Sequence, residues 1–292
     1  MNHSGKTIMQ PFSIFYPKND PNGILFNSPH SGMYLPEDFL TQIILDPALL
    51  HHSGDILVDQ LVRDVPKSGA TSFINHYART YVDTNRDAQE IDPDMFHNPD
   101  IRPTTKSQKV ARGFGIFSRK SYDGQDIYEA KLPAAEIDHR LSHVYHPVHD
   151  ALRNALNDLH QQQGFCLLID CHSMPSYAFI DPSLSNSKQP DLIIGDCFGT
   201  SCPENLSRHV ARFFTERGLK VTFNVPYSGG FNTQAYGKPG DNRNALQLEF
   251  SRALYMDEKT LKPHEGFSPL QLLLTGLSEN LAKNLADFFT AE

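Results

Sequence analysis

Short hydrophobic runs of strand length alternate with longer amphipathic stretches along most of this chain. Apolar runs bounded by proline, glycine or polar clusters predict β-strands, and they lie at residues 24–26, 71–75, 165–169, 192–194, 219–225 and 245–250. Helical spacing predicts helices at 55–62, at 134–162 with an interruption at Pro147, at 204–217 and at 270–289. The run at 165–169 lacks alternation, which is typical of a strand buried on both faces.

Strands that alternate with helices predict an α/β fold with a mixed, largely parallel central sheet and helices on both faces. Segments 18–22, 181–190 and much of 89–121 are expected to be loops. None of them has the length and composition of a linker between independent domains, so we expect residues 1–292 to form one domain.

Charge and cysteine content narrow the function classes. Lys and Arg number 26 against 34 Asp and Glu, so the net charge is −8, which disfavours nucleic-acid binding. The N-terminal segment is broken by prolines before a signal peptide can form, and no run is long and apolar enough to span a membrane. Four cysteines suit a reducing compartment, and we expect a cytoplasmic protein.

Polar residues that follow predicted strands are the first candidates for chemistry, because ligands of α/β sheets bind beyond the carboxyl ends of the strands. Segment 27–32 carries His30, segment 170–175 carries His172, and Glu249 lies in the strand at 245–250. A single histidine after a strand is most often a hydrogen-bonded loop residue. Two together can supply imidazoles to a catalytic zinc, which needs about three protein ligands and one open position.

The third ligand of such a site should be a carboxylate. Asp55 and Asp59 are one turn apart on a predicted helix, so one of them can bind metal while the other orients a ligand. The alternative is that Asp55 only stabilises the N-terminus of that helix through its dipole.

Two further segments are rich in functional groups. Segment 79–87 contains Arg79, Asn85 and Arg86, which suit recognition of a substrate carboxylate or, alternatively, form a structural ion pair with aspartate in a turn. Segment 224–231 contains Tyr227 and the pair Gly229–Gly230, which indicate either a hairpin or a mobile flap whose N–H groups meet an anion.

Other patterns are weaker. His139, His143, His146 and His149 recur at helical spacing without a carboxylate that completes a catalytic set, so we expect a partly exposed histidine-rich helix with His149 facing the site. Cys197 and Cys202 have no second ligand pair for structural zinc. The motifs of serine hydrolases and nucleotide-binding enzymes are missing from the sequence.

Several long segments, in this order, resemble the N-formylglutamate amidohydrolase (deformylase) family of histidine degradation. The resemblance spans roughly residues 20–260, and several motifs in register are far more specific than one short pattern. The matching segments are 28–32, 55–61, 79–86, 170–175, 224–231 and 245–258.

This resemblance implies a phosphorylase/hydrolase-like α/β fold related to the zinc carboxypeptidases, with one zinc or another divalent ion. By the resemblance, His30, Asp55 and His172 are the metal ligands, and Asp59 is the fallback for Asp55. Glu249 is the general base. One departure is Met33, which stands where the carboxypeptidase pattern has its glutamate ligand.

The resemblance also implies how substrate is held. Asn85 and Arg86 correspond to a carboxylate-binding pair, and Arg79 or Arg243 is expected to hold a second carboxylate or stabilise the oxyanion. Tyr227, Gly229 and Gly230 are expected to contact substrate.

The implied reaction is hydrolysis of N-formyl-L-glutamate, a small N-acylated dicarboxylate, to formate and L-glutamate. The alternatives are a relative of the same fold that cleaves another N-acyl amino acid or a peptide, and a non-catalytic metal- or amino-acid-binding protein. Oligomeric state does not follow from the sequence.

Overall fold

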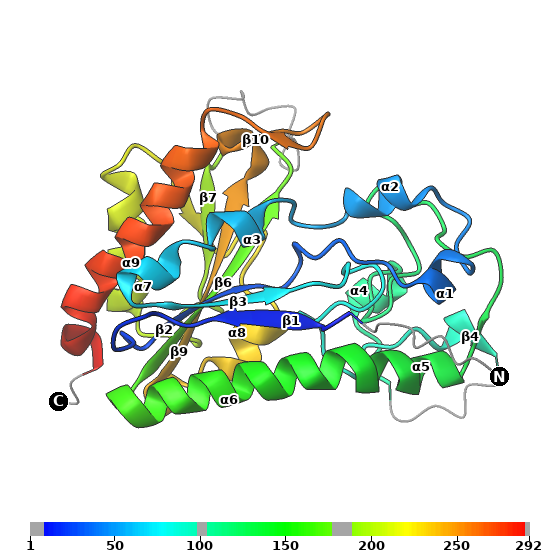
Figure 1. Ribbon diagram of the computed structural model, residues 1–292, viewed down its shortest axis with the longest axis horizontal. Helices are drawn as coiled ribbons and strands as arrows, with labels where there is room; N and C mark the ends of the chain where they lie inside the picture. The colour runs from blue at the N-terminus through cyan, green and yellow to red at the C-terminus, as the bar shows by residue number, and fades with distance from the viewer. Residues whose placement is uncertain (1–8, 98–103, 177–188, 290–292) are drawn as a thin grey trace.

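A mixed seven-stranded sheet forms the centre of the protein (Figure 1). The computed structural model describes residues 9–97, 104–176 and 189–289. The strand order is β1-β3-β2-β6-β9-β7-β8. The strands are β1 (Phe12–Phe15), β2 (Ile24–Ser28), β3 (Thr71–Asn75), β6 (Cys166–Met174), β7 (Leu192–Gly195), β8 (Val221–Phe223) and β9 (Arg243–Ser251).

The four central strands β3, β2, β6 and β9 run parallel. Strand β1 pairs antiparallel with β3, and β7 pairs antiparallel with β9 and parallel with β8. The predicted mixed α/β sheet is therefore confirmed. The strand expected at 219–225 is shorter, and β1 was not predicted. Because the central strands are parallel, their carboxyl ends meet at one edge of the sheet.

Strand β6 is nearly twice as long as its apolar run predicts. The predicted strand 165–169 ends where the polar residues begin, but these residues continue the ladder with β9 from Cys166 opposite Arg243 to Met174 opposite Ser251. Strand β9 supplies backbone partners along the whole length, so polar side chains do not end the strand. The pairing sets His172 directly beside Glu249.

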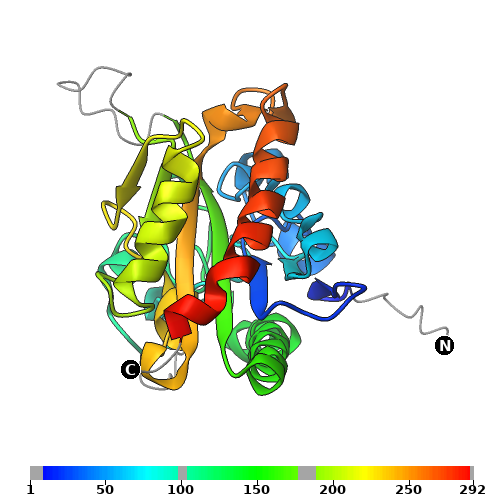
Figure 2. The same ribbon diagram turned by 90° about the vertical axis from the view of Figure 1, so that its left-hand side faces the viewer.

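Helices cover both faces of the sheet, as predicted. Helix α6 (His146–Gln163) packs on one face, whereas α3 (Val58–Leu61), α7 (Glu204–Thr215) and α9 (Phe267–Phe289) pack on the other. Figure 2 shows α6 (green) and α7 (yellow) on opposite sides of the strands. Leu168 and Ala245 contribute to the α6 face, so by the two-residue period of a strand His172 and Glu249 also point to that face.

The helical segment predicted at 134–162 consists of α5 (Ala135–Arg140), a π-helical turn (Leu141–Tyr145) and α6. Pro147 lies in the first turn of α6. A proline ring clashes with the carbonyl four residues earlier in a regular α-helix, and the wider π turn accommodates it. The chain therefore continues through Pro147 without a break.

A second hydrophobic cluster packs beside the carboxyl edge of the sheet. It contains aromatic residues such as Phe39, Tyr81 and Phe117, and the fully buried guanidinium of Arg140 lies 4.6 Å from the centre of the Tyr81 ring. The short elements around it are α1 (Glu37–Leu40), α2 (Pro47–His51), α4 (Gln108–Ala111) and the pair β4 (Phe96–His97) and β5 (Leu132–Pro133). Figure 1 shows α1, α2, α4 and α5 gathered at the right of the sheet.

The remaining elements are α8 (Phe231–Tyr236), the pair β10 (Met256–Asp257) and β11 (Lys262–Pro263), and short 3-10 turns at Val65–Ser68, Pro93–Met95, Pro239–Asp241 and Arg252–Leu254. Segment 18–22 carries no helix or strand, as predicted, and most of the loop expected at 181–190 lies outside the described residues. Among the helices that the structure describes, none combines the length and apolar character required to cross a membrane.

Candidate active site

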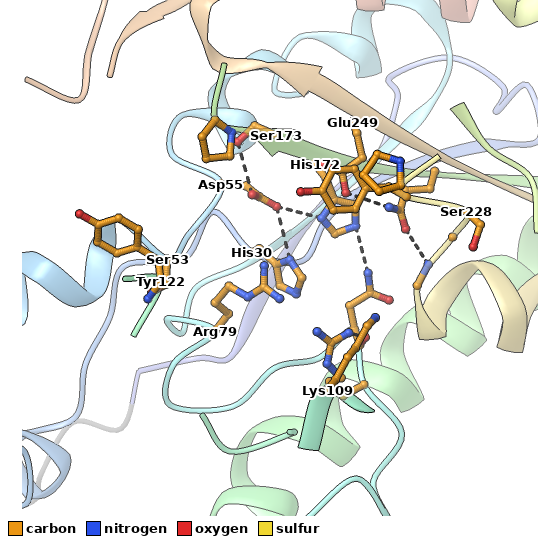
Figure 3. A pocket seen from close by; sticks show the side chains of 18 of the residues that line it. His30, Ser53, Asp55, Arg79, Lys109, Tyr122, His172, Ser173, Ser228 and Glu249 are labelled. Atoms are coloured by element: carbon orange, nitrogen blue, oxygen red, sulfur yellow. Dashed lines mark hydrogen bonds and ion pairs between the residues drawn. The ribbon is translucent and has the colours of Figure 1, made fainter. Parts of the chain in front are cut away.

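A cavity of about 580 Å³ opens at the carboxyl ends of β6 and β9 (Figure 3). Its walls come from segments far apart in sequence: the loop after β2, the segment before α3, residues 79–86, strands β6 and β9, and the loop before α8. His30, Asp55, His172 and Glu249 all line it. The structure thus brings together the four side chains on which the predicted chemistry depends.

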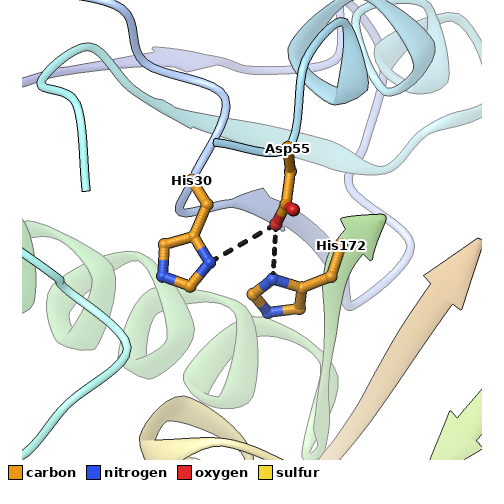
Figure 4. A group of neighbouring side chains, drawn as sticks. All are labelled: His30, Asp55 and His172. Carbon is orange, nitrogen blue, oxygen red and sulfur yellow. Dashed lines mark hydrogen bonds and ion pairs between the residues drawn. The ribbon is translucent and has the colours of Figure 1, made fainter. Parts of the chain in front are cut away.

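Three possible metal ligands converge at one side of this cavity (Figure 4). Oδ2 of Asp55 lies 2.8 Å from Nδ1 of His172 and 3.3 Å from Nδ1 of His30. All three residues are buried, and their ligand atoms lie within 4.8 Å of one another. Two imidazoles and one carboxylate are a ligand set typical of catalytic zinc sites, which leave one position open for water or substrate.

Backbone contacts fix Asp55 in this arrangement. Its amide donates a 2.9 Å hydrogen bond to the carbonyl of His30, and Nη2 of Arg252 donates to the carbonyl of Gly54 at 2.7 Å. The hydroxyl of Ser173 donates to the second carboxylate oxygen of Asp55 at 3.3 Å. The Asp55 segment is therefore held to both histidine-bearing elements.

The predicted helix 55–62 is wrong in its first turn. Helix α3 begins only at Val58, after Leu57 with a left-handed φ of 67°. Asp55 and Asp59 therefore do not share a helical face, and Asp59 does not line the cavity. Asp55 also lies outside α3, so stabilisation of a helix N-terminus does not account for its burial.

A second pair of carboxylates holds the far nitrogens of the two histidines. Nε2 of His30 lies 2.7 Å from Oδ1 of Asp83, and Nε2 of His172 lies 2.9 Å from Oδ2 of Asp170. A carboxylate at Nε2 favours the ring proton on that atom and Nδ1 as the metal-binding atom. Nε2 of His172 also lies 3.0 Å from Nδ2 of Asn85. Neither contact with an aspartate follows from the sequence pattern, although both aspartates stand in candidate segments, Asp83 in 79–87 and Asp170 in 170–175.

The electrostatics of the cluster suit a cation. Burial alone would raise the pKa of Asp55, but the hydrogen bond with His172 and the nearby imidazole of His30 outweigh it and hold the pKa far below the ordinary value. Nδ1 of His30 is buried and has no hydrogen-bond partner within the described part of the chain. An unpaired buried nitrogen beside an ionised carboxylate fits a metal ion, because coordination would satisfy both groups.

Glu249 is held beside the cluster by an amide relay. Oε1 of Gln247 accepts a 2.6 Å hydrogen bond from the amide of Gly230, which directs Nε2 of Gln247 to donate to Oε1 of Glu249 at 2.8 Å. Burial raises the pKa of Glu249 to about 7; His172 opposes the shift and Asp55 adds to it. The second carboxylate oxygen accepts no hydrogen bond from the described residues, so it remains available to a water in the cavity.

Asn85 lines the cavity, but its side-chain amide is used inside the protein. Nδ2 donates to Oδ2 of Asp170 at 3.2 Å, and Oδ1 accepts from the amide of Asn232 at 2.8 Å. Asn27 and Asn232 also donate to Asp170, so three amides surround this buried carboxylate. That Asn85 binds a substrate carboxylate stays a prediction. In this arrangement its polar atoms already have partners, which also include Nε2 of His172 at 3.0 Å from Nδ2.

The other expected substrate contacts divide into two groups. Arg79, Arg86, Tyr227, Gly229 and Gly230 line the cavity. The loop 224–231 is neither a hairpin nor an anion-binding flap at Gly230, because α8 begins at Phe231 and the N–H of Gly230 is bound by Gln247. Lys109, from a segment that was expected to be a loop, also lines the cavity.

Arg243 is not brought to the cavity. It begins β9, at the opposite end of the strand from Glu249, and it lines a separate cavity that also contains His149. The expectations that Arg243 binds substrate and that His149 faces the site are therefore wrong. The direction of β9 places Arg243 at the far end of the strand. His149 lies on the side of α6 that contacts Tyr236, and its Nδ1 is 2.8 Å from the Tyr236 hydroxyl.

Comparisons with known proteins agree with this geometry. The sequence model of the family described as N-formylglutamate amidohydrolase matches residues 22–256. An N-formylglutamate deformylase of Pseudomonas putida is 29% identical over 238 residues, which cover 80% of this chain and 82% of the relative. The N-formylglutamate deformylase of Pseudomonas aeruginosa is 28% identical over 239 residues, or 81% and 83% of the two chains.

Solved structures show the same relation. The crystal structure of N-formylglutamate amidohydrolase from Ralstonia eutropha JMP134 superposes with a TM-score of 0.89 at 33% identity, covering 96% of this chain and 99% of that one. A gene product of Agrobacterium tumefaciens shares the fold, with a TM-score of 0.61 at 17% identity over 95% and 96% of the two chains. The family match over most of the sequence and the closely superposing structure lead to one conclusion: this chain belongs to the N-formylglutamate amidohydrolase family.

Proposed function

We propose that this protein hydrolyses N-formyl-L-glutamate to formate and L-glutamate with one divalent ion, zinc, held by His30, Asp55 and His172. The observation that carries the proposal is the convergence of these three side chains and Glu249 in one cavity. The names of the relatives supply the substrate. A role in histidine degradation rests on the family resemblance, and a cytoplasmic location is supported by four free cysteines.

The residues of the chain divide the chemistry among them. A divalent ion at this site supplies Lewis acidity, which polarises a carbonyl and acidifies water. Asp83 and Asp170 keep the Nδ1 atoms of the two histidines turned toward that ion. Their negative charge also raises the basicity of the imidazoles.

Glu249 acts as the general base. Its carboxylate takes one proton from the attacking water, the water oxygen forms a bond to the formyl carbon, and the carbon–nitrogen bond then breaks. The proton on Glu249 passes to the departing nitrogen, so that formate and the amino group of glutamate are the products. Gln247 holds one carboxylate oxygen of Glu249 and thereby directs the other one to the water.

Arginine side chains orient the substrate. Nη1 and Nε of Arg86 bind the carbonyls of Asn85 and Phe114, which fixes the guanidinium plane at the cavity wall and leaves Nη2 for the α-carboxylate. Arg79 is bound by Asp83 at 2.6 Å, and it lies close to His30, where the oxyanion develops. Holding the substrate in this way places its formyl group beside Glu249.

The test is formate release from N-formyl-L-glutamate before chelation, after chelation and after zinc is added back. We expect activity to disappear with the metal and to return with zinc. N-acetyl-L-glutamate and short peptides serve as competing substrates. Faster turnover of either would assign the chain to another amide, and zinc-loaded protein that turns over none of them would indicate a binding protein.

A further inference from the structure

The positive charges of the cavity can be sorted by what they already bind. Among the residues that the structure describes, four cationic side chains line it: Arg79, Arg86, Lys109 and Arg252. N-acylated glutamate has lost its amine charge and carries two carboxylates, so a site that selects it needs two cationic groups that are not used elsewhere. This inference rests on the proposed function, because it concerns the substrate of the same site.

Two of the four cations hold the protein together. Arg79 donates to Asp83 at 2.6 Å. Arg252 donates to the carbonyl of Gly54 at 2.7 Å and to Ser173 at 3.2 Å. Both guanidinium groups therefore support the segments that carry the metal ligands, and neither can move to bind a substrate carboxylate without releasing those contacts.

Arg86 and Lys109 remain. Arg86 makes its hydrogen bonds to backbone carbonyls through Nε and Nη1, and Nε forms a long ion pair of 3.9 Å with Asp83. Its Nη2 has no hydrogen-bond partner among the described residues. The ammonium of Lys109 forms no hydrogen bond or ion pair with any residue in the described ranges. Partial burial and the neighbouring Arg86 lower the pKa of Lys109, against the opposing charges of Asp83 and Glu90.

Lys109 also stands where a longer substrate would reach. The main cavity adjoins a second one of about 650 Å³, and both are lined by Asn85, Arg86, Lys109, Gly230 and Gln234. Figure 3 shows Lys109 across the cavity from Glu249, beyond His172. A substrate with its formyl group beside Glu249 and its α-carboxylate at Arg86 would extend its side chain toward this junction.

We propose that Lys109 binds the side-chain carboxylate of the substrate and so selects N-acylated dicarboxylic amino acids over neutral ones. Arg86 binds the α-carboxylate, which all N-acyl amino acids share. Lys109 then determines specificity without taking part in bond breaking.

The experiment compares Lys109→Met with Lys106→Met, a nearby exposed lysine that lines neither cavity. The ligands are N-formyl-L-glutamate and its neutral isostere N-formyl-L-glutamine. Binding is measured by calorimetry on zinc-loaded protein that also carries Glu249→Gln, so that ligand is not consumed. Formate release is measured in parallel with Glu249 intact.

We expect Lys109→Met to weaken binding of N-formylglutamate, and to raise its KM, by about tenfold or more, as for loss of one charge-assisted hydrogen bond. In Lys109→Met, the kcat and the binding of N-formylglutamine should change by less than about twofold. Lys106→Met should leave the binding of both ligands unchanged. A structural role for Lys109 would instead affect both ligands alike.

Equal losses for the two ligands, unchanged binding of N-formylglutamate, or binding of neither ligand overturns the proposal. If N-formylglutamate binds through Lys109 but the wild type releases no formate, the subsite stands and the proposed function fails. If formate is released and Lys109→Met behaves as wild type, only the subsite fails.

Discussion

Replacing Asp170 by Asn tests whether the carboxylate behind His172 controls metal binding. Asp170 is fully buried, and its two oxygens accept hydrogen bonds from Asn27, Asn85, Asn232 and His172. Asparagine has the same shape, but it carries no charge and has only one oxygen. The amide nitrogen must therefore face at least one of these donors in place of an acceptor oxygen.

The arrangement of donors indicates which contact is lost. Oδ2 faces His172 at 2.9 Å and Asn85 at 3.2 Å, whereas only Asn27, at 2.6 Å, approaches Oδ1 closely. The new amide nitrogen is thus expected to face Asn27 and remove the acceptor of its Nδ2. The cost is at most about 1–3 kcal/mol in the free energy of unfolding, because Oδ1 of Asn27 has no partner among the described residues and can turn to accept from the new amide. His172 keeps an acceptor without a charge, so zinc affinity should fall by about 10- to 100-fold.

Zinc affinity is measured by competition with a chromogenic chelator, and stability by urea unfolding of the metal-free protein. Asp158→Asn, which changes an exposed carboxylate on α6, is the matched control and should leave both quantities unchanged. If Asp170→Asn folds and binds zinc as tightly as the wild type, Asp170 does not orient His172 and our account of the outer hydrogen bonds is wrong.

Three further predictions follow from other contacts. Glu249→Gln should keep its zinc by elemental analysis while formate release falls by about 10²- to 10⁴-fold; near-normal turnover would remove Glu249 from the chemistry. Gly230→Ala places a methyl group 2.4 Å from the Asn85 amide, so it should lower the free energy of unfolding by about 1–3 kcal/mol and reduce activity; Gly240→Ala, where nothing lies within 4 Å, is the control, and equal stability of the two variants would contradict the packing argument. Burial lowers the pKa of His149 from 6.5 to about 4, so the unfolded chain takes up this proton first as pH falls. The contribution of neutral His149 to the free energy of unfolding is about 3 kcal/mol. It is fully present above pH 6.5 and is lost as the pH falls toward 4. Urea unfolding should show a correspondingly weaker pH dependence in His149→Gln, and an unchanged dependence would refute this origin.

The hydrophobic pattern identified most of the sheet because the central strands are buried on both faces. The strand predicted at 71–75 coincides with β3, and the runs at 24–26, 192–194 and 245–250 lie within observed strands. The pattern underestimated β6, since Asp170 and His172 continue the strand at polar positions. What extends β6 is the backbone of β9, which is distant in sequence.

The choice between Asp55 and Asp59 shows a limit of local rules. Helical periodicity treats the two carboxylates as equivalent, but the left-handed backbone at Leu57 and the hydrogen bond from Asp55 to His30 separate them. Asn85 and Arg243 show the same limit. Their residue types suit carboxylate binding. Only the folded chain gives Asn85 partners inside the protein and places Arg243 at the end of β9 that lies away from the site.

The sequence by itself determined the class of fold, the strands of its core, and the histidines and glutamate that stand near the carboxyl ends of those strands, because hydrophobic period and strand direction are local properties. Only the tertiary structure decided which aspartate meets the histidines, which carboxylates stand behind them, and which cations remain free for a substrate. Those outcomes depend on contacts between segments as much as 200 residues apart, such as Arg252 with the loop before Asp55, and on burial that no local pattern encodes.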